Sequence, residues 1–309
     1  MDFLTILTPS YNRGYILPKL YQSLVVQTDK DFEWLIVDDG STDDTAEIVR
    51  NFISEGKILV RYIKKENGGK HTALNVGVQN ITAKWTMIVD SDDSLTENAV
   101  ESIHYYSDKF DTYNTDKPLC GISFLRAFPD GNTNGKKPEK NEVISDFIQN
   151  RINSHDELAD KAEVYLTDVL KKYPFPVYND ERFLQENIVW ISMAFDYNML
   201  FLNEAIYIGD YLSDGLTRNV MKNKLNNPIG MYKNAELLMR PEFTFKNRLK
   251  GAVLYNIYYK IAHKKMKNGL KLSANRLLCG ITLFPSELIY LYYMKKYSQF
   301  LSDKRLGEN

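Results

Sequence analysis

The sequence predicts an α/β protein with a mainly parallel central sheet, helices on both faces of that sheet, and a helical C-terminal region. Over residues 1–130, short apolar runs are each followed by a stretch with helical periodicity. This alternation is typical of right-handed βαβ units. The runs are apolar without polar alternation, as expected for strands that are covered on both faces. From Met221 onward the pattern is helical throughout.

The elements of the first half follow from these local patterns. Strands are expected at 3–8, 33–38, 58–64, 84–90 and 119–128. Helices are expected at 16–27, 43–53, from about His71, and at 96–110. Ser41 or Thr42 could N-cap the second helix. The polar segment 129–142 is expected to form a surface loop.

The second half is less regular, and its charge changes along the chain. Strand and helix signals mix at 162–175, a long helical run is expected near 186–200, and a strand is expected at 205–208. We expect two regions, an α/β domain at 1–217 and a helical region at 218–309. The helical region holds 18 Lys and Arg against 5 Asp and Glu, a net +13, in a chain of net −1. Such a region favours anionic partners.

Cysteine usage and the N-terminus predict a cytoplasmic protein. Cys120 and Cys279 are far apart and lie in apolar runs, so we expect them to be reduced core residues. The opening MDFLTILTPSYNRG has no basic n-region, and its apolar run is too short for a signal peptide. It is expected to form the first strand.

The most apolar window is LLCGITLFPSELIYLYYM, residues 277–294. Pro285 and Glu287 interrupt it, so a transmembrane helix is not expected. The flanking Lys295 and Lys296 fit an interfacial or packed amphipathic helix. An ordinary core helix is the alternative.

Unusual polar groups follow three of the predicted strands. They are TPSYNR (8–13), VDDGSTD (37–43) and VDSDDS (89–94). Ligands of open parallel sheets bind at the carboxyl ends of the strands, so these segments are expected to form one pocket. The sequence contains neither a Walker-type loop nor a Gly-x-Gly-x-x-Gly motif after the first strand. Because carboxylates repel phosphates, a divalent cation such as Mg²⁺ or Mn²⁺ should bridge them.

Each of these acids also has a purely local interpretation. Asp93 and Ser94 could cap the helix that is expected to begin near Thr96, and Asp38 and Asp39 could form an Asx-turn before Gly40. Clustering at three strand ends favours a binding site over three separate turns.

Four motifs in this order resemble the family 2 glycosyltransferases, which have the Rossmann-like GT-A fold. They are TPSYNR, VDDGSTDDT, ENGGKHTALNVGV and IVDSDDSL. The resemblance is strong over residues 3 to about 110, moderate to about 217 and weak or absent beyond. It implies a nucleotide-sugar donor, most often a UDP-sugar, and a divalent metal, Mn²⁺ or Mg²⁺.

The resemblance also assigns roles to particular residues. It places Thr8, Pro9 and Tyr11 along the base, and Asp39 at the uracil or ribose with Asp38 beside it. It places Lys70 and His71 near the nucleotide and its phosphates, with Asn75 in support of that loop. Asp90 would lie near the ribose or donor sugar, and Asp92 would bind the metal. His71 could alternatively be only a helix-start residue.

Inverting glycosyl transfer needs a general base for the acceptor hydroxyl. By resemblance this is Glu186 in ERFLQENIVW, although Asn187 follows it where the family commonly has Asp. Asp180 and Glu181 are weaker candidates, and Glu186 could also be a favourable first-turn carboxylate. In YLSDGLTRN (211–219), Thr217 and Arg218 are candidate phosphate contacts or solvated surface residues.

Two other function classes fit parts of the sequence. A nucleotidyltransferase would normally need a glycine-rich basic loop near the first strand, where TPSYNRG offers only Arg13. A catalytically silent, glycosyltransferase-like carbohydrate-binding protein is the second alternative, because Asn187 departs from the family pair. A receiver-type phosphotransfer domain would explain only Asp38 and Asp39.

The sequence lacks the Gln-x-x-Arg-Trp motif and the transmembrane helices of processive synthases, so a non-processive enzyme is expected. The acceptor would be a glycan or a polyprenyl-diphosphate-linked oligosaccharide in surface polysaccharide synthesis. Region 218–309 would then dock on the inner membrane face or form a homodimer. Nucleic acid is not an expected partner, because no recognised motif for it occurs.

Overall fold

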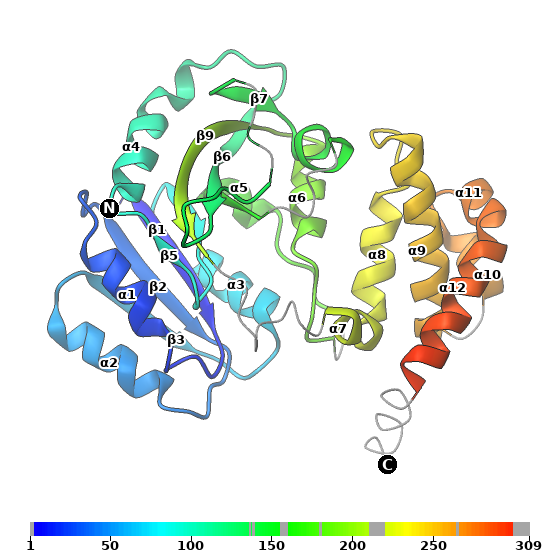
Figure 1. Cartoon of the computed structure of the whole chain (residues 1–309), viewed down its shortest axis with the longest axis horizontal. Coiled ribbons are helices and arrows are strands. Elements are labelled where there is room, and N and C mark those ends of the chain that lie inside the picture. The colour runs from blue at the N-terminus through cyan, green and yellow to red at the C-terminus, as the bar shows by residue number, and fades with distance from the viewer. Residues whose placement is uncertain are drawn as a thin grey trace. The chain divides into compact units, whose positions relative to one another are not determined.

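The computed structural model describes residues 3–135, 137, 140–154, 160–178, 181–209, 220–263 and 266–298. The chain divides into two compact units. The first contains Met1–Phe175 and Val189–Asp210, and the second contains Pro176–Ile188 and Tyr211–Asn309. Figure 1 shows a sheet with helices in the first unit and helices in the second.

A nine-stranded sheet forms the centre of the first unit. Its strands are β1 (Leu4–Ser10), β2 (Phe32–Asp38), β3 (Leu59–Lys64), β4 (Trp85–Ile88), β5 (Ser94–Leu95), β6 (Leu119–Ala127), β7 (Val143–Ser145), β8 (Lys161–Leu166) and β9 (Asn198–Ile208). The order is β3-β2-β1-β4-β8-β6-β9-β5, and β7 also pairs with β9. Strands β5, β7 and β8 run against the other strands. The predicted mainly parallel sheet is confirmed.

Helices cover both faces of this sheet (Figure 1). Leu4 and Ile6 of β1 belong to a core cluster with side chains of α1 (Leu17–Val25), α2 (Thr45–Glu55) and α4 (Ala99–Lys109). Leu7 packs on α3 (Lys70–Gln79) instead. A Cβ at Gly77 of α3 would lie 2.3 Å from Leu7 Cδ1, so any larger residue would force the Leu7 side chain to shift. The full burial of β1 and β2 follows from this two-sided cover.

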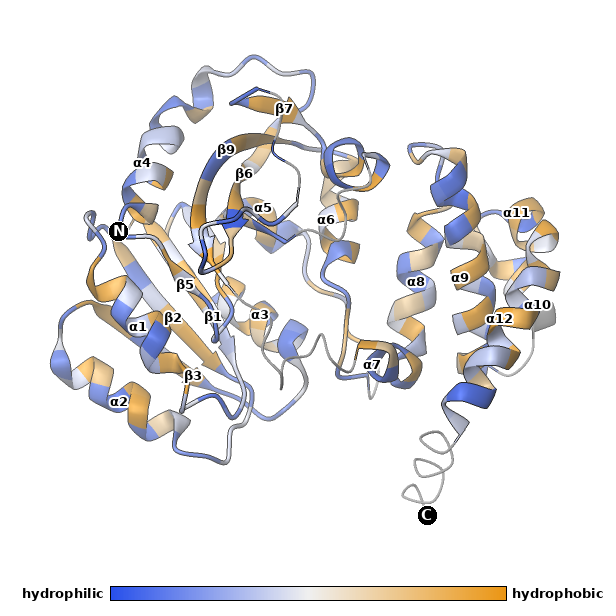
Figure 2. Cartoon of the chain, viewed as in Figure 1, coloured by the Kyte–Doolittle hydropathy of each residue, from blue (hydrophilic) through white to orange (hydrophobic). Residues whose placement is uncertain are grey.

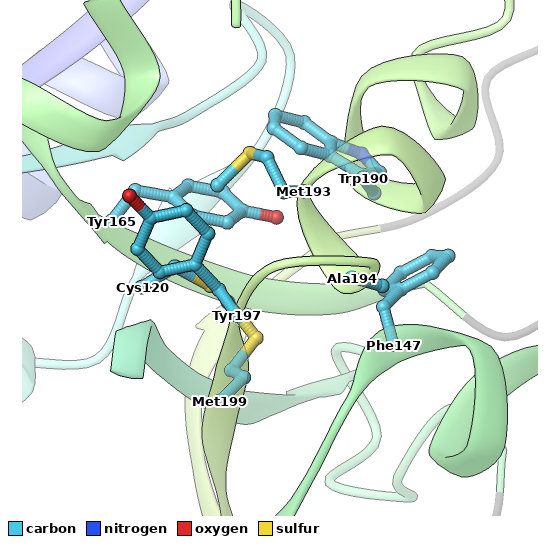
Figure 3. A pocket seen from close by; sticks show the side chains of 8 residues that line it. All are labelled: Cys120, Phe147, Tyr165, Trp190, Met193, Ala194, Tyr197 and Met199. Atoms are coloured by element: carbon cyan, nitrogen blue, oxygen red, sulfur yellow. The ribbon is translucent and has the colours of Figure 1, made fainter. Parts of the chain in front are cut away.

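The remaining elements of the first unit are short. They are a 3₁₀ turn (Phe110–Thr112), a π-helix (Ile148–Asn153), α5 (Thr167–Lys172) and most of α6 (Asn187–Ala194). Trp190 of α6 stacks on Tyr165 at 4.6 Å between ring centroids. Beside this pair lies a small cavity of about 10 Å³, lined mainly by apolar and aromatic side chains such as Cys120 and Met199 (Figure 3).

The second unit is mainly helical in its described part. It comprises α7 (Val220–Asn226), α8 (Pro228–Leu237), α9 (Phe245–His263), α10 (Met266–Leu272), α11 (Arg276–Ile281) and α12 (Leu283–Lys296). Tyr232 of α8 packs edge-on against Tyr255 and Tyr259 of α9. No described helix has the length and apolar character needed to cross a membrane.

Both cysteines are free and buried, as predicted. Burial raises the pKa of the Cys120 thiol to about 12, so this thiol stays protonated and unreactive at neutral pH.

Two boundary predictions were wrong. The helical run expected near 186–200 stops at Ala194, and β9 starts at Asn198, because Asn198 and Leu200 find pairing partners in β6. Neither Ser41 nor Thr42 caps α2, whose N-cap is Asp44. Ser41 Oγ instead accepts a hydrogen bond from the Asn12 amide.

Candidate active site

The three polar segments identified in the sequence lie at the same edge of the sheet. Strands β2 and β4 are the parallel neighbours of β1, and Ser10 is in register with Asp38. The Asp39 amide continues this pairing by donating to the Ser10 carbonyl at 2.8 Å. The carboxyl ends of the three strands therefore bring their following segments together.

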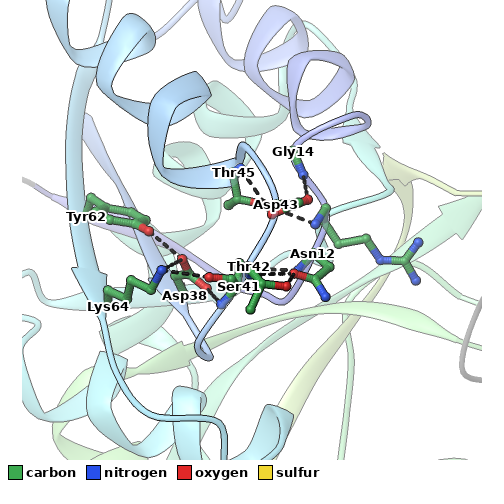
Figure 4. Close-up of polar contacts among 10 residues, drawn as sticks. Asn12, Gly14, Asp38, Ser41, Thr42, Asp43, Thr45, Tyr62 and Lys64 are labelled. Carbon is green, nitrogen blue, oxygen red and sulfur yellow. Dashed lines mark hydrogen bonds and ion pairs between the residues drawn. The ribbon is translucent and has the colours of Figure 1, made fainter.

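Asp38 is fully buried and serves the structure of this edge (Figure 4). Its Oδ1 accepts from the Ser41 amide at 2.7 Å, and its Oδ2 accepts from the Tyr62 hydroxyl. Burial and this carboxylate raise the pKa of Tyr62, so the phenol remains a donor. Lys64 Nζ lies 3.9 Å from Asp38 and donates to the Ser41 carbonyl. Both carboxylate oxygens therefore already have partners.

A second set of hydrogen bonds joins the loops that follow β1 and β2 (Figure 4). Asn12 has a left-handed backbone, with φ 52°, and its Oδ1 accepts from the Thr42 amide at 2.8 Å. Asp43 accepts from the Gly14 and Thr45 amides and from the Thr45 hydroxyl. Partial burial would raise the pKa of Asp43, but these donors outweigh it and lower the pKa. These hydrogen bonds thus fix the loops after β1 and β2 to one another.

Asp39 holds the start of α3. Its Oδ1 accepts from Lys65 Nζ at 2.6 Å and from the Gly68 amide at 3.0 Å. Its Oδ2 accepts from the Gly69 amide at 2.7 Å. The carboxylate satisfies amides at the helix N-terminus, where negative charge is favourable.

Lys70 and His71 begin α3 on the same edge. Lys70 Nζ lies 2.6 Å from Asp90 Oδ1. Nearby atoms desolvate Asp90, which raises its pKa, but the Lys70 ammonium outweighs this and lowers the pKa below its ordinary value. His71 is 3% exposed, and within the described structure its Nδ1 has no hydrogen-bond partner. Burial lowers the pKa of His71, so the imidazole is neutral.

The residues assigned to the base differ in accessibility. Thr8 is fully buried, and its Oγ1 accepts from the Trp34 indole at 2.9 Å. Its side chain therefore belongs to the core. Pro9 is buried in the same strand, whereas Tyr11 is 48% exposed. Of these three side chains, Tyr11 is available to a ligand. Asn75 exchanges two 2.8 Å hydrogen bonds with the Phe175 backbone and so positions that segment.

Three carboxylates gather after β4. Asp90, Asp92 and Asp93 each offer an oxygen within 4.8 Å of the others. Asp90 and Asp92 are partly exposed, whereas Asp93 is buried. Clustered carboxylate oxygens match the ligand preference of Mg²⁺ and Mn²⁺.

Asp93 belongs to a buried network that sequence reasoning missed. Tyr207 of β9 donates to Asp93 Oδ2 at 2.7 Å, and Arg126 of β6 lies 3.2 Å from Oδ1. Burial raises the pKa of Asp93 to about 7, although Arg126 acts against the rise. The suggestion that Asp93 caps the next helix was wrong, because Ser94 and Leu95 pair with β9 and α4 starts only at Ala99.

The residues assigned to proton transfer belong to the second unit. Glu186 is partly buried and immediately precedes α6. Glu181 accepts from the Ile229 and Gly230 amides at 2.6 and 2.7 Å, so both its oxygens hold the N-terminus of α8. This use makes Glu181 a poor base. Asp180, Thr217 and Arg218 lie outside the described residues.

Together these features define an α/β protein with an oxygen-donor site at the carboxyl edge of its sheet. Residues 5–152 match the model of the family described as glycosyl transferase family 2. These residues, just under half of the chain, therefore correspond to a family 2 glycosyltransferase domain. The GT-A fold class is confirmed by the likeness of the chain to a solved structure.

That structure is TarS residues 1–349 from S. aureus, with a TM-score of 0.60 at 17% identity, covering 93% of this chain and 78% of TarS 1–349. TarS has also been solved with UDP and with UDP-GlcNAc. A mannosyltransferase from Pyrobaculum calidifontis, solved with GDP-Man and Mn²⁺, has a TM-score of 0.51 at 13% identity, covering 96% of this chain and 83% of that one. At such identities these likenesses concern the fold alone.

Curated relatives match about a third of the chain. The glycosyltransferase GlyA of Streptococcus pneumoniae is 38% identical over 103 residues, which are 33% of this chain and 15% of GlyA. The poly(ribitol-phosphate) β-N-acetylglucosaminyltransferase TarP of Staphylococcus aureus is 34% identical over 110 residues, which are 34% of this chain and 33% of TarP. The chain thus spans only a minor part of these relatives.

Proposed function

We propose that this protein is a metal-dependent, inverting glycosyltransferase that moves one sugar from a nucleotide-sugar, a UDP-sugar in our proposal, to an acceptor hydroxyl. The observation that carries the proposal is the partly exposed pair Asp90 and Asp92, beside Lys70, at the carboxyl edge of a family 2 domain. Structures of TarS with UDP and UDP-GlcNAc support the choice of nucleotide.

The donor would lie over the edge formed by β1, β2 and β4. Tyr11 would face the base, Lys70 would neutralise diphosphate charge, and His71, which is buried, would lie near the nucleotide and support the start of α3. Asp39 would act through the loop that it holds, since Gly68, Gly69 and Lys65 occupy its oxygens. Arg218 and Thr217 remain proposed phosphate contacts in a segment outside the described residues.

Asp92, with Asp90 beside it, would hold a divalent cation, and these two carboxylates suit the role because Asp93 is already bound to Arg126 and Tyr207. When bound, the ion would stabilise negative charge on the departing diphosphate. The acceptor oxygen forms a bond to the anomeric carbon while the bond from that carbon to the diphosphate oxygen breaks. Glu186 would take the acceptor proton, and inversion follows from attack opposite the leaving group.

The acceptor in our proposal is a glycan or a polyprenyl-diphosphate-linked oligosaccharide of surface polysaccharide synthesis, extended by one sugar per encounter in the cytoplasm. Residues 1–217 would perform the transfer, and residues 218–309 would serve acceptor or membrane docking. A nucleotidyltransferase would cleave a nucleoside triphosphate and release pyrophosphate, and a silent binding protein would turn over no donor.

The test is a panel of nucleotide sugars with Mn²⁺ or Mg²⁺, read by thermal shift and by nucleotide release. We expect one nucleotide class to raise the melting temperature only when metal is present. Asp92→Asn should abolish the metal-dependent shift, and Asp111→Asn, at an exposed acid, is its control. Release of pyrophosphate from a triphosphate, or no response to any sugar nucleotide, would contradict the proposal.

Glu186→Gln separates the base from donor binding. Loss of a general base should lower turnover roughly 10²–10⁴-fold while the thermal shift by nucleotide and metal persists. Glu242→Gln, at an exposed acid of the second unit, is the matched control. Unchanged turnover in Glu186→Gln would overturn this assignment, and no turnover in wild type with intact donor binding would favour the silent protein.

A further inference from the structure

Helices α11 and α12 carry large apolar side chains on their solvent-facing side. These residues, which we call the outer face, are Leu277, Ile281, Phe284, Leu288 and Leu291, and they are between 53% and 74% exposed. Figure 2 shows apolar colouring on parts of α11 and α12. Exposed apolar surface that is contiguous, rather than scattered, marks an interaction site.

The spacing of these residues makes the outer face continuous. They follow one another at intervals of four, three, four and three residues across two consecutive helices. Such spacing keeps side chains on one side of a helix. Lys295 continues the same series at the C-terminal end. Tyr292, which follows Leu291 in the sequence, is 56% exposed.

The inner side of the same helices carries both apolar and polar residues, because Leu278 and Cys279 belong to the hydrophobic core of the second unit. Thr282 and Ser286 are buried, and Asn256 of α9 donates to the Cys279 carbonyl at 2.9 Å and to Thr282 Oγ1 at 3.1 Å. An amphipathic helix on a water-soluble domain normally has apolar residues inward and polar residues outward, whereas here the outward side is apolar as well. Polar residues between helices and apolar residues outward are typical of helices in contact with lipid.

The charges around the outer face are positive. Over 276–298 the only acid is Glu287, and both its oxygens are held by Lys260 Nζ at 2.6 Å. Arg276 lies at one end of the segment, and Lys295 and Lys296 lie at the other. The whole region 218–309 has a net charge of +13. The outer face is thus an apolar strip with basic ends.

We propose that the outer face docks on the surface of an anionic lipid bilayer. Phe284 and the leucines would enter the boundary between headgroups and acyl chains, and the lysines would contact anionic headgroups. A second copy of the chain fits less well as a partner. It would bring together two regions that each have a net charge of +13, with no complementary acids beside the outer face. The proposal rests on the docking role proposed above for residues 218–309, to which it adds the contacting face and the class of lipid, and it does not depend on which donor is used.

The test is sedimentation of the full-length protein with vesicles of phosphatidylcholine alone or of equal parts phosphatidylcholine and phosphatidylglycerol. We expect binding to the anionic vesicles, weakened by salt. The double variant Phe284→Ser/Leu288→Ser should lower the affinity by about tenfold or more. Ile53→Ser/Leu59→Ser removes two comparably exposed apolar groups from the first unit and should leave binding unchanged.

Each result can be read without the catalytic assay. Equal binding to neutral and anionic vesicles, or full binding by Phe284→Ser/Leu288→Ser, would overturn the proposal. Concentration-dependent dimerisation that this variant abolishes, with no lipid binding by wild type, would overturn it in favour of self-association. Circular dichroism and the nucleotide thermal shift verify that the variant is folded, so a loss of donor binding is recognised separately from a loss of lipid binding.

Discussion

The acidic residues at the sheet edge divide into structural and ligand-available groups according to their hydrogen bonds. Asp38 and Asp43 accept from loop amides and hydroxyls, and Asp39 accepts from Gly68 and Gly69. Asp90 and Asp92 remain partly exposed. A buried carboxylate is stable only when donors satisfy its oxygens, so the structural acids organise the loops that present the other two.

His71 should make stability depend on pH. Its pKa is lowered in the folded protein by burial, so the folded state binds fewer protons than the unfolded chain. The contribution of neutral His71 to the stability of the folded protein is complete above the pKa of histidine in the unfolded chain, about 6.5. This contribution is lost as the pH falls below that value.

The measurement is urea unfolding of wild type and His71→Gln at pH about 8 and about 5.5, on either side of an ordinary histidine pKa. We expect acidification to destabilise wild type more than the variant, since glutamine does not titrate. Equal losses in both proteins would show that His71 is not held neutral by the fold.

The sequence indicated candidate donor-site residues but did not indicate the partners that some of them have in the structure. Asp90 and Asp92 stood out because they follow a buried strand. The partners of Asp93 could not be found in this way, because Arg126 is 33 residues away and Tyr207 is 114 residues away. Such a contact depends on β9 lying between β6 and β5 in the sheet. No local pattern encodes that order.

Among the elements, local periodicity located the strands where strands and helices alternate along the chain. It did not locate the start of β9, whose pairing partner lies far away in the sequence. Each of β1 to β4 overlaps a predicted run, although β1 extends to Ser10 and β2 begins at Phe32. By contrast, β9 was expected to start at 205 but starts at Asn198, after a long apolar stretch that also suits a helix. The segment from Asn198 forms a strand rather than a helix because it pairs with β6. This is a tertiary effect, which the local propensity of the residues does not include.

Gly121 is predicted to be essential to the β6–β8 pair. A Cβ at this position would lie 2.2 Å from the Val164 carbonyl oxygen, and backbone atoms of a central strand cannot move aside. Gly121→Ala should therefore lower the free energy of unfolding by about 2–3 kcal/mol.

Gly280→Ala provides the contrast, because nothing lies within 4 Å of the added atom and Gly280 is helical. Alanine there should raise stability by about 0.5–1 kcal/mol. Urea denaturation of both variants measures the two effects. Similar stability changes in the two proteins would contradict the steric argument.

At the scale of the whole molecule, the proposed functions are divided between the two units. The acidic cluster and the loops around it belong entirely to the first unit, whereas Glu186 and the outer face of α11 and α12 belong to the second. In our proposal, the donor contacts are residues of the first unit, whereas the assigned base and the lipid-contacting residues belong to the second. This division was only partly visible in the sequence, where the charge change near residue 218 does not reveal that Pro176–Ile188 belongs with the C-terminal helices.

Two ligands should therefore protect different units from hydrogen exchange. We expect UDP with Mn²⁺ to slow exchange in the segments after β1, β2 and β4 and at the start of α3, because the proposed donor contacts lie there. Anionic vesicles should slow exchange in α11 and α12, whose outer face would leave water. With both ligands present, the two patterns should add. Protection of α12 by UDP alone would contradict the separation of roles, and a vesicle effect confined to the first unit would place the lipid contact elsewhere.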